Sequence, residues 1–289
     1  MSLKVKIILA IVIILAVVGV IFANISKKAS RPIKPAELVK PAEAVYEIIG
    51  TSVQGRKIES YTYGTSTKKL AFVGGVHGGY EWNSILLAYQ IKDYLDKNPT
   101  SIPAGLSVII IPNLNPDGQF KVTGKEGRFS LVDVSTSTSV QESGRFNANG
   151  VDLNRNFDCK WQPKSTWRSK EVSAGASAFS EPEASAFRDF ISTKKPSAVV
   201  FWHSQSNAVY ASQCNNGILP GTLAIMDVYS KASLYPAVKT FDAYVTTGAA
   251  DDWLASINIP AITVELKTHE TIEFDRNLAG VKALFEYYR

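Results

Sequence analysis

Two of the three histidines in the 289-residue chain, His77 and His203, each follow a short apolar run and stand beside small or polar residues. Glu81 comes four residues after His77, at the start of a predicted helix. A catalytic zinc ion takes three protein ligands and keeps a fourth position for water. His77, Glu81 and His203 would supply nitrogen, oxygen and nitrogen donors to such an ion. Buried, hydrogen-bonded histidines are the alternative, and one His–Glu pair does not decide between the two.

A second group of polar residues is concentrated in residues 144–157, which read GRFNANGVDLNRNF. Two arginines, several asparagines and an aspartate in one short segment are atypical of a core strand. They are typical of a loop that binds carboxylates, because arginine offers a planar, bidentate donor fork. A solvated, turn-rich surface loop is the alternative interpretation.

Short apolar runs bounded by turn residues predict the buried strands of a parallel or mixed sheet. They are Leu70–Val76, Leu106–Pro112, Ala198–Trp202 and Ile259–Val264. Helices are predicted between or after them, over Glu81–Lys97, from a capping box at Ser180–Glu183 to about Lys194, and over Asp275–Tyr288. This alternation predicts an α/β fold. His77, His203 and Glu265 all lie at strand ends, where the active sites of such folds are found.

The segment from Gly144 to Phe157 closely resembles the zinc metallocarboxypeptidases of the carboxypeptidase A/B and N/E type. The likeness covers most of residues 60–289 and its elements occur in family order. They are His77 with Glu81–Trp82, Asn115–Gly118, His203–Ser204, Tyr244–Trp253 and Val264–Leu266. The resemblance implies one α/β domain with a mixed, mostly parallel central sheet flanked by helices. It also implies one zinc ion (Zn2+) per chain and hydrolysis of the C-terminal bond of peptides or proteins.

The resemblance gives the catalytic machinery residue by residue. His77, Glu81 and His203 match the zinc ligands of the family. Glu265 stands where the family has its general base, which takes a proton from the attacking water and passes it to the leaving amine. Arg145 matches the arginine that stabilises the oxyanion.

The resemblance also gives the substrate-binding residues. Asn154 and Arg155 match the pair that binds the terminal carboxylate of the substrate, and Tyr244 matches the mobile tyrosine that caps it. Asp251 matches the base of the pocket for the C-terminal side chain. An aspartate there accompanies a preference for Lys or Arg, and the alternative is that Asp251 only caps a turn.

One spacing departs from the family pattern. Three residues separate His77 from Glu81 where the family usually has two. Gly78 and Gly79 lie in this stretch and tolerate positive φ, so they can absorb the extra residue.

Two other functions stay open at this point. One is an amidase that cuts cell-wall peptides by the same zinc chemistry, and the other is a non-catalytic binding module.

The charge of the chain is unevenly distributed. Residues 1–40 hold seven of the 31 basic residues and one of the 26 acidic residues, which leaves 24 basic and 25 acidic residues in the remainder. The formal net charge of +5 therefore comes from the N-terminal segment. A protein that binds nucleic acid through phosphates would carry positive charge on its folded part, so nucleic acid is not expected as a partner.

The run Ile7–Ala23 is apolar or small throughout and is just long enough to cross a bilayer core of roughly 30 Å. It predicts a transmembrane signal anchor over residues 1–24, with a cleaved signal peptide as the alternative. Residues 25–44 are expected to form a linker. Residues 45–289 are expected to form a monomeric catalytic domain outside the cytoplasm, membrane-anchored or secreted. Cys159 and Cys214 form either a disulfide or two buried thiols.

Overall fold

The computed structural model describes residues 2–26 and 44–289 and divides the chain into two units, Met1–Pro41 and Ala42–Arg289. In the first unit, residues Leu3–Ser26 form helix α1. The side chains of this helix are described as far as residue 19. Over the described residues, no helix combines the length and the apolar character that crossing a bilayer requires. Most of the predicted linker lies outside the described residues.

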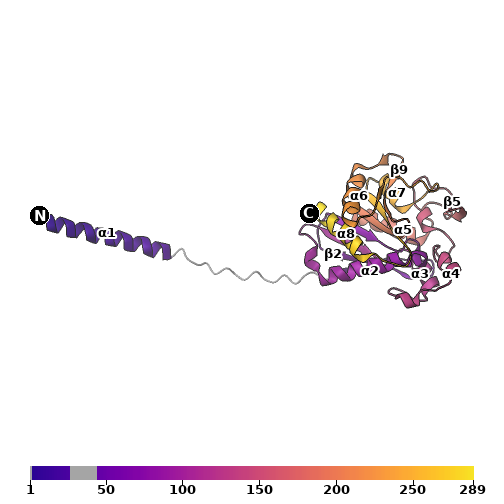
Figure 1. Ribbon diagram of the computed structural model, residues 1–289, viewed down its shortest axis with the longest axis horizontal. Coiled ribbons are helices and arrows are strands. Elements are labelled where there is room, and N and C mark those ends of the chain that lie inside the picture. Colours follow the sequence, from indigo (N-terminus) through magenta and orange to yellow (C-terminus); the bar gives the residue numbers. More distant parts are fainter. Residues whose placement is uncertain (1, 27–43) are drawn as a thin grey trace. The chain divides into compact units, whose positions relative to one another are not determined.

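The second unit is built around a sheet that, over residues 44–289, has eight strands in the order β1-β2-β4-β3-β7-β12-β8-β11 (Figure 1). Their bounds are β1 (Val45–Thr51), β2 (Lys57–Tyr63), β3 (Lys69–Val73), β4 (Ser107–Ile111), β7 (Ala198–Ser204), β8 (Ala208–Ala211), β11 (Ala237–Val238) and β12 (Ala261–Leu266). Two small hairpins stand apart from this sheet, formed by β5 (Lys164–Trp167) with β6 (Lys170–Ser173) and by β9 (Gln213–Cys214) with β10 (Gly217–Ile218).

The helices of this unit connect and cover the strands. The α-helices are α2 (Trp82–Lys97), α3 (Pro116–Thr123), α4 (Thr138–Ser143), α5 (Pro182–Lys194), α6 (Pro220–Ser233), α7 (Ala250–Ser256) and α8 (Phe274–Tyr287). Short 3-10 helices occupy η1 (Gly78–Glu81), η2 (Pro99–Ser101), η3 (Leu131–Asp133) and η4 (Leu153–Arg155).

The sheet has a parallel centre that is flanked on each side by an antiparallel pair. Strands β4, β3, β7 and β12 pair in parallel, whereas β2 runs antiparallel to β4 and β8 antiparallel to β12. The predicted α/β class, with a mixed sheet flanked by helices, is confirmed. The four predicted strands correspond to β3, β4, β7 and β12, and each lies within three residues of its predicted bounds.

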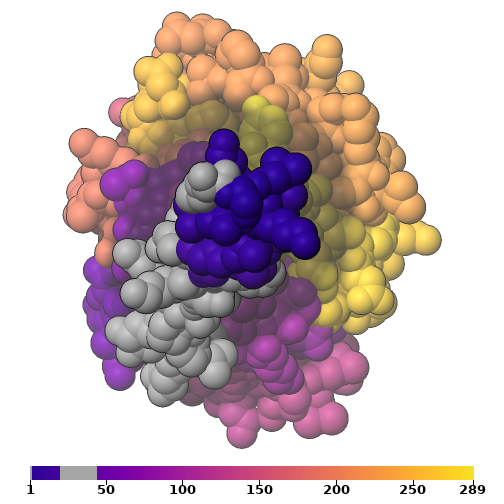
Figure 2. All heavy atoms as spheres, turned by 90° about the vertical axis from the view of Figure 1, so that its left-hand side faces the viewer, coloured from indigo at the N-terminus to yellow at the C-terminus, as the bar shows by residue number. Residues whose placement is uncertain are grey.

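Alternating side chains bury both faces of the sheet. Leu70 and Phe72 of β3 pack into one core with α2, α6 and α8. Ala71 and Val73 pack into the other core with α5 and α7. This period of two is what a strand covered on both faces requires. Figures 1 and 2 show that, within the second unit, the residues after about 200 lie mainly on one side and the residues up to about 150 on the other.

One predicted helix start is wrong in detail. Helix α5 begins at Pro182 with Glu181 at its N-cap, and the predicted capping box at Ser180 does not form. The hydroxyl of Ser180 donates to Glu181 Oε1 at 2.9 Å. The carboxylate of Glu183 accepts hydrogen bonds from Asn147 and from the backbone N–H of Val53. The Ser180 hydroxyl also accepts from Asn156 Nδ2 at 3.0 Å, so both side chains are engaged outside the predicted cap.

Cys159 and Cys214 form a disulfide across a sequence separation of 55 residues. The bridge joins the loop after η4 to β9. The structure thus selects the disulfide from the two alternatives that the sequence left open.

Candidate active site

His77 lies directly before η1, and the glycines that follow it allow the chain to turn there. Gly78 has φ +45° and packs against backbone, so that a Cβ atom on it would lie 2.8 Å from the carbonyl oxygen of Gly144. A Cβ atom on Gly79 would lie 2.5 Å from the side chain of Val122. Only glycine fits both positions without displacing the neighbouring chain. The resulting 3-10 turn accommodates the extra residue and directs Glu81 back toward His77.

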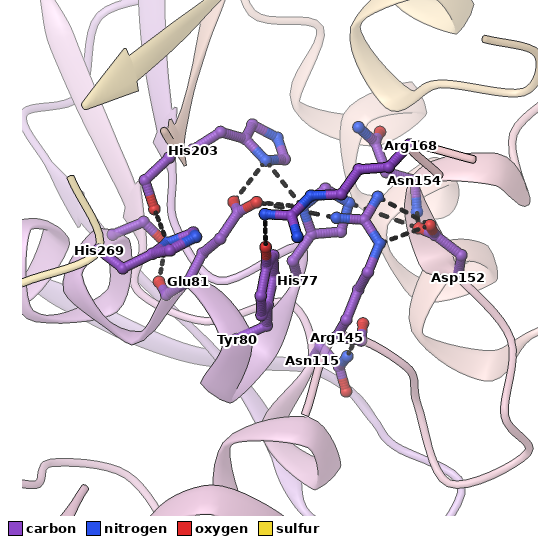
Figure 3. Close-up of polar contacts among 12 residues, drawn as sticks. His77, Tyr80, Glu81, Asn115, Arg145, Asp152, Asn154, Arg168, His203 and His269 are labelled. Carbon is purple, nitrogen blue, oxygen red and sulfur yellow. Dashed lines mark hydrogen bonds and ion pairs between the residues drawn. The ribbon is translucent and has the colours of Figure 1, made fainter. Parts of the chain in front are cut away.

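His77, Glu81 and His203 converge on one point (Figure 3). Glu81 Oε1 lies 2.7 Å from His77 Nδ1, and Glu81 Oε2 lies 2.8 Å from His203 Nδ1. The two Nδ1 atoms are 3.1 Å apart. All three side chains are buried, and their donor atoms lie within 4.8 Å of one another. Two imidazole nitrogens and a carboxylate facing one another in this way fit the ligand set of a catalytic zinc site.

The three groups also perturb one another's protonation. Burial alone would raise the pKa of Glu81, but the imidazoles of His77 and His203 outweigh burial and hold this pKa well below its usual range. Burial would lower the pKa of His203, and the Glu81 carboxylate outweighs it and raises this pKa. Glu81 is therefore a carboxylate, which is the form that binds a metal ion.

Asp152 contacts the ring nitrogen of His77 that does not face Glu81. The sequence motif alone did not reveal this role. Asp152 is fully buried and lies 3.4 Å from His77 Nε2 through Oδ1. Its Oδ2 accepts from Arg145 Nε and lies 2.8 Å from Arg145 Nη2. Burial would raise the pKa of Asp152, but Arg145 and Arg155 outweigh it and lower this pKa. A carboxylate behind a metal-binding histidine fixes the tautomer and orientation of the ring.

Asp152 holds two of the three guanidinium nitrogens of Arg145, and the third, Nη1, points elsewhere. Arg145 Nε and Nη2 face Asp152, and its Nη1 lies 3.9 Å from Glu81 Oε1. The side chain is buried, with its guanidinium carbon 4.7 Å from the centre of the Trp167 ring. Arg145 therefore presents a positive charge beside the His77–Glu81–His203 cluster.

Glu265 lies on β12, directly opposite His203 of β7 in the parallel register. It lines the cleft, and its Oε2 is buried without a hydrogen-bond partner among the described residues. Burial, reinforced by the negative charge of Glu81, raises the pKa of Glu265 to about 7. Two further glutamates follow the end of β12 in sequence: Glu270 is exposed, and Glu273 is bound to Arg276.

A cleft of about 310 Å³ opens beside the cluster, lined by Arg145, Glu265 and the predicted substrate-binding residues. Arg155 is buried there and donates to the carbonyl oxygens of Thr166 and Asn154. Asn154 accepts from the backbone N–H of Ala250 through Oδ1 at 2.9 Å, which leaves its amide nitrogen for the cleft. Tyr244 lines the same cleft and packs edge-on against Phe241, with ring centres 4.9 Å apart.

Two adjacent aspartates at the start of α7 form the acidic part of the cleft. Asp251 Oδ2 accepts from the hydroxyl of Thr263 at 3.0 Å, and Asp252 Oδ1 accepts from the backbone N–H of Gln213 at 2.8 Å. All four residues line the cleft. In the described part of the chain, the side-chain contact of Asp251 is the one with Thr263.

Tyr80, Trp167 and Arg168 form a further wall of the cleft that sequence analysis did not identify. Tyr80 lies in the stretch with the extra residue between His77 and Glu81, so the unusual spacing was the available signal. Its ring packs edge-on against Trp167 and lies 4.6 Å from the ring centre of His269. His269 accepts or donates a hydrogen bond at Ser204, beside His203.

A family model described as zinc carboxypeptidase matches residues 37–278. Gamma-D-glutamyl-L-diamino acid endopeptidase 1 of Lysinibacillus sphaericus is 26% identical over 240 residues, which cover 75% of this chain and 59% of the relative. Carboxypeptidase B of Helicoverpa zea is 31% identical over 147 residues, or 49% of this chain and 33% of the relative. The chain thus spans less than two thirds of the length of these relatives.

The fold has solved counterparts. The crystal structure of murein-tripeptide amidase MpaA from Escherichia coli O157 matches with a TM-score of 0.60 at 22% identity, covering 84% of this chain and 91% of that one. At this identity the match shows a shared fold. The family match extends over most of the chain and includes His77, Glu81 and His203. The chain therefore belongs to the zinc carboxypeptidase family, and His77, Glu81 and His203 are the residues that could hold a metal ion.

Proposed function

We propose that this protein removes the C-terminal residue of a peptide and prefers a residue whose side chain carries a positive charge. The observation that carries the proposal is the pairing of opposite charges in one cleft. Arg155 and Asn154 offer donors for a terminal carboxylate, and Asp251 offers an acceptor for a cationic side chain. Arginine binds carboxylates through its planar fork, and a half-buried aspartate attracts an ammonium or guanidinium group.

The residues divide the reaction between them. A bound zinc ion supplies Lewis acidity and lowers the pKa of a water ligand to about 7. Glu265, opposite His203 and with a free Oε2, takes a proton from the attacking water and delivers it to the leaving amine. Arg145, held by Asp152, presents Nη1 to the negative charge that develops on the scissile carbonyl oxygen. Arg155 fixes the chain terminus, so that only the last peptide bond reaches these groups.

A cell-wall peptide is the second candidate substrate, and the names of two similar proteins favour it. One is a gamma-D-glutamyl-L-diamino acid endopeptidase, and the other is a murein-tripeptide amidase. A diamino acid at the end of a peptide combines a carboxylate with a side-chain amine. Arg155 and Asp251 would bind these two groups in the same way as those of a C-terminal lysine.

The side-chain preference is tested with peptides that differ only in the last residue, Lys, Arg, diaminopimelate or Phe. The wild type is expected to cleave the first three with the higher kcat/KM. Asp251→Asn should lower these values by roughly 10-fold or more, because a charge-assisted contact is lost, and should leave the Phe peptide unchanged. The exposed Asp227→Asn on α6 serves as the matched control. A wild-type preference for Phe that Asp251→Asn does not alter would refute the assignment.

We also propose that the catalytic unit works outside the cytoplasm, secreted or held at a membrane by the N-terminal segment, as a monomer. The disulfide between Cys159 and Cys214 supports an oxidising compartment. The apolar run Ile7–Ala23 supports export. Proteolysis of intact cells that express the full chain tests this proposal. External protease should remove the catalytic unit from anchored protein, and a unit that stays protected until the cells are lysed would contradict it.

A further inference from the structure

The end of strand β5 and the turn that follows it contact residues of the cleft in sequence order. The carbonyl oxygen of Thr166 accepts from Arg155 Nη2 at 2.9 Å. The ring of Trp167 lies under the guanidinium of Arg145 at 4.7 Å. Arg168 Nη2 donates to the hydroxyl of Tyr80 at 2.9 Å. Thr166, Trp167 and Arg168 therefore contact Arg155, Arg145 and Tyr80 in turn.

This order can be matched to an extended substrate. A strand advances about 3.3 Å per residue, as does an extended peptide. If Arg155 binds the last residue and Arg145 the carbonyl that is cleaved, Arg168 lies beside the residue that supplies this carbonyl. In Figure 3 the side chain of Arg168 reaches the Tyr80 hydroxyl, and His269 and Asn154 lie on opposite sides of Glu81. Arg168 thus serves the upstream end of the cleft.

Among the residues that the structure describes, Arg168 has no carboxylate partner as close and as buried as the one that Arg145 has. Arg145 faces the fully buried Asp152 at 2.8 Å. The nearest carboxylate to Arg168 in the described chain is Glu142, at 4.0 Å from Nη1, and Glu142 is shared with Lys170 at 3.5 Å. Two cations and one anion leave a net positive charge at this place. The Arg168 side chain is 54% exposed, so its guanidinium is open to a ligand.

The backbone and the surrounding rings hold Arg168 in place. It has φ +55°, a left-handed conformation that non-glycine residues adopt at a cost, in the turn between β5 and β6. Its guanidinium carbon lies 5.3 Å from the ring centre of Trp167. Tyr80 orients the same group through its hydroxyl. A preorganised arginine needs less ordering when it binds a carboxylate.

We propose that Arg168 binds a carboxylate carried by the substrate residue immediately before the scissile bond. The inference rests on the proposed carboxypeptidase function, because it takes its direction from Arg155. Two kinds of residue supply such a carboxylate. One is a glutamate joined through its side chain, which leaves its α-carboxylate free, and the other is an ordinarily linked aspartate or glutamate. The substrate is then acidic upstream of the cut and cationic at its end.

Two pairs of peptides, both ending in lysine, test the proposal with the zinc-loaded enzyme. One pair has α-linked Glu or Gln before the lysine. The other has γ-linked D-Glu with its α-carboxylate free or amidated. The wild type should show a kcat/KM about 10-fold higher for the acidic member of at least one pair, as expected for a charged hydrogen bond at a half-exposed site. The pair that shows the preference identifies the source of the carboxylate.

Variants of Arg168 distinguish a role in recognising the substrate carboxylate from a role in stabilising the fold. Arg168→Gln should abolish the preference by lowering only the acidic peptide, with the amidated peptide within about twofold, and Arg168→Lys should retain part of it. Arg188→Gln is the matched control. Arg188 also lies over an aromatic ring, 5.0 Å from the centre of Phe179, and beside an aspartate, but on α5 outside the cleft.

Three results would overturn the inference. Equal cleavage of both members of each pair by the wild type would leave the proposed hydrolysis intact and remove the role of Arg168. An equal loss on acidic and amidated peptides in Arg168→Gln would show a structural role. Failure to cleave any of the peptides would refute both the inference and the proposed function.

Discussion

Glu265 and His203 face each other across the parallel pair β12 and β7, in register and on the same side of the sheet. Two neighbouring strands therefore bring a candidate metal ligand and a carboxylate, whose Oε2 has no partner among the described residues, to the same end of the sheet. Because the strands are in the core of the sheet, the relative position of the two groups is set by backbone hydrogen bonds and does not depend on a loop.

The first prediction concerns Glu265 as the base. Glu265→Gln should lower kcat by roughly 10²–10⁴-fold, the usual contribution of a general base, while the protein still binds one zinc ion per chain. Steady-state kinetics together with metal analysis measure both quantities. Glu270→Gln, on an exposed residue past the strand end, is the control and should retain activity. A larger loss in Glu270→Gln than in Glu265→Gln would show that the base was misassigned.

The second prediction concerns Glu81, the ligand whose spacing is unusual. Glu81→Ala removes the carboxylate that lies within 2.8 Å of both histidine Nδ1 atoms, so zinc affinity should fall by more than 100-fold and activity with it. Competition with a chromogenic chelator measures the affinity. Stoichiometric zinc and full activity in this variant would mean that another residue completes the site.

The third prediction concerns Asp152 behind His77. Asp152→Asn keeps the shape but removes the charge that orients His77 and Arg145. Zinc affinity should fall by about 10–100-fold, as is usual when the partner of a metal-binding histidine is lost. Asp158→Asn, exposed on the same loop, is the matched control. Similar affinities in the two variants would contradict a supporting role for Asp152.

The fourth prediction is a pH dependence of stability that originates in Asp252. Burial and the negative charge of Asp251 raise the pKa of Asp252 to about 8, whereas an unfolded aspartate titrates near 3.9. Between about pH 4 and pH 8 the folded state holds the extra proton, so Asp252 makes stability fall as the pH rises through this window.

Asp252→Asn should therefore flatten this decline and stabilise the protein at pH 8 by at least about 1 kcal/mol, while still accepting from the Gln213 backbone N–H. Urea unfolding at pH 5, 6.5 and 8 measures the slope, with Asp158→Asn as the reference. An unchanged slope would mean that Asp252 is ionised in the folded protein across this range.

Much of the site could be predicted from the sequence because its residues lie at strand ends. His77, His203 and Glu265 each follow or end an apolar run, and parallel strands bring such ends together. Arg145, Asn154 and Arg155 could be predicted because they share one motif, and the structure brings all of them to the same cleft.

Other features depend on tertiary contacts that no local pattern contains. Asp152 was visible in the motif, but its contact with His77 joins segments that are far apart in sequence. The capping box at Ser180 failed because Glu183 is bound by Asn147. The wall formed by Tyr80 and Arg168 requires the β5–β6 hairpin to fold over the cleft, which spacing alone does not reveal.

The most direct test of the account is the release of a C-terminal lysine by the purified protein, followed by mass spectrometry of the products. The same peptide is incubated with the zinc-loaded protein, after removal of the metal with a chelator, and after zinc is added back. We expect the loss of a single C-terminal residue, which the chelator abolishes, zinc restores and amidation of the peptide terminus blocks. Release that persists without metal, or equal cleavage of the amidated peptide, would contradict it.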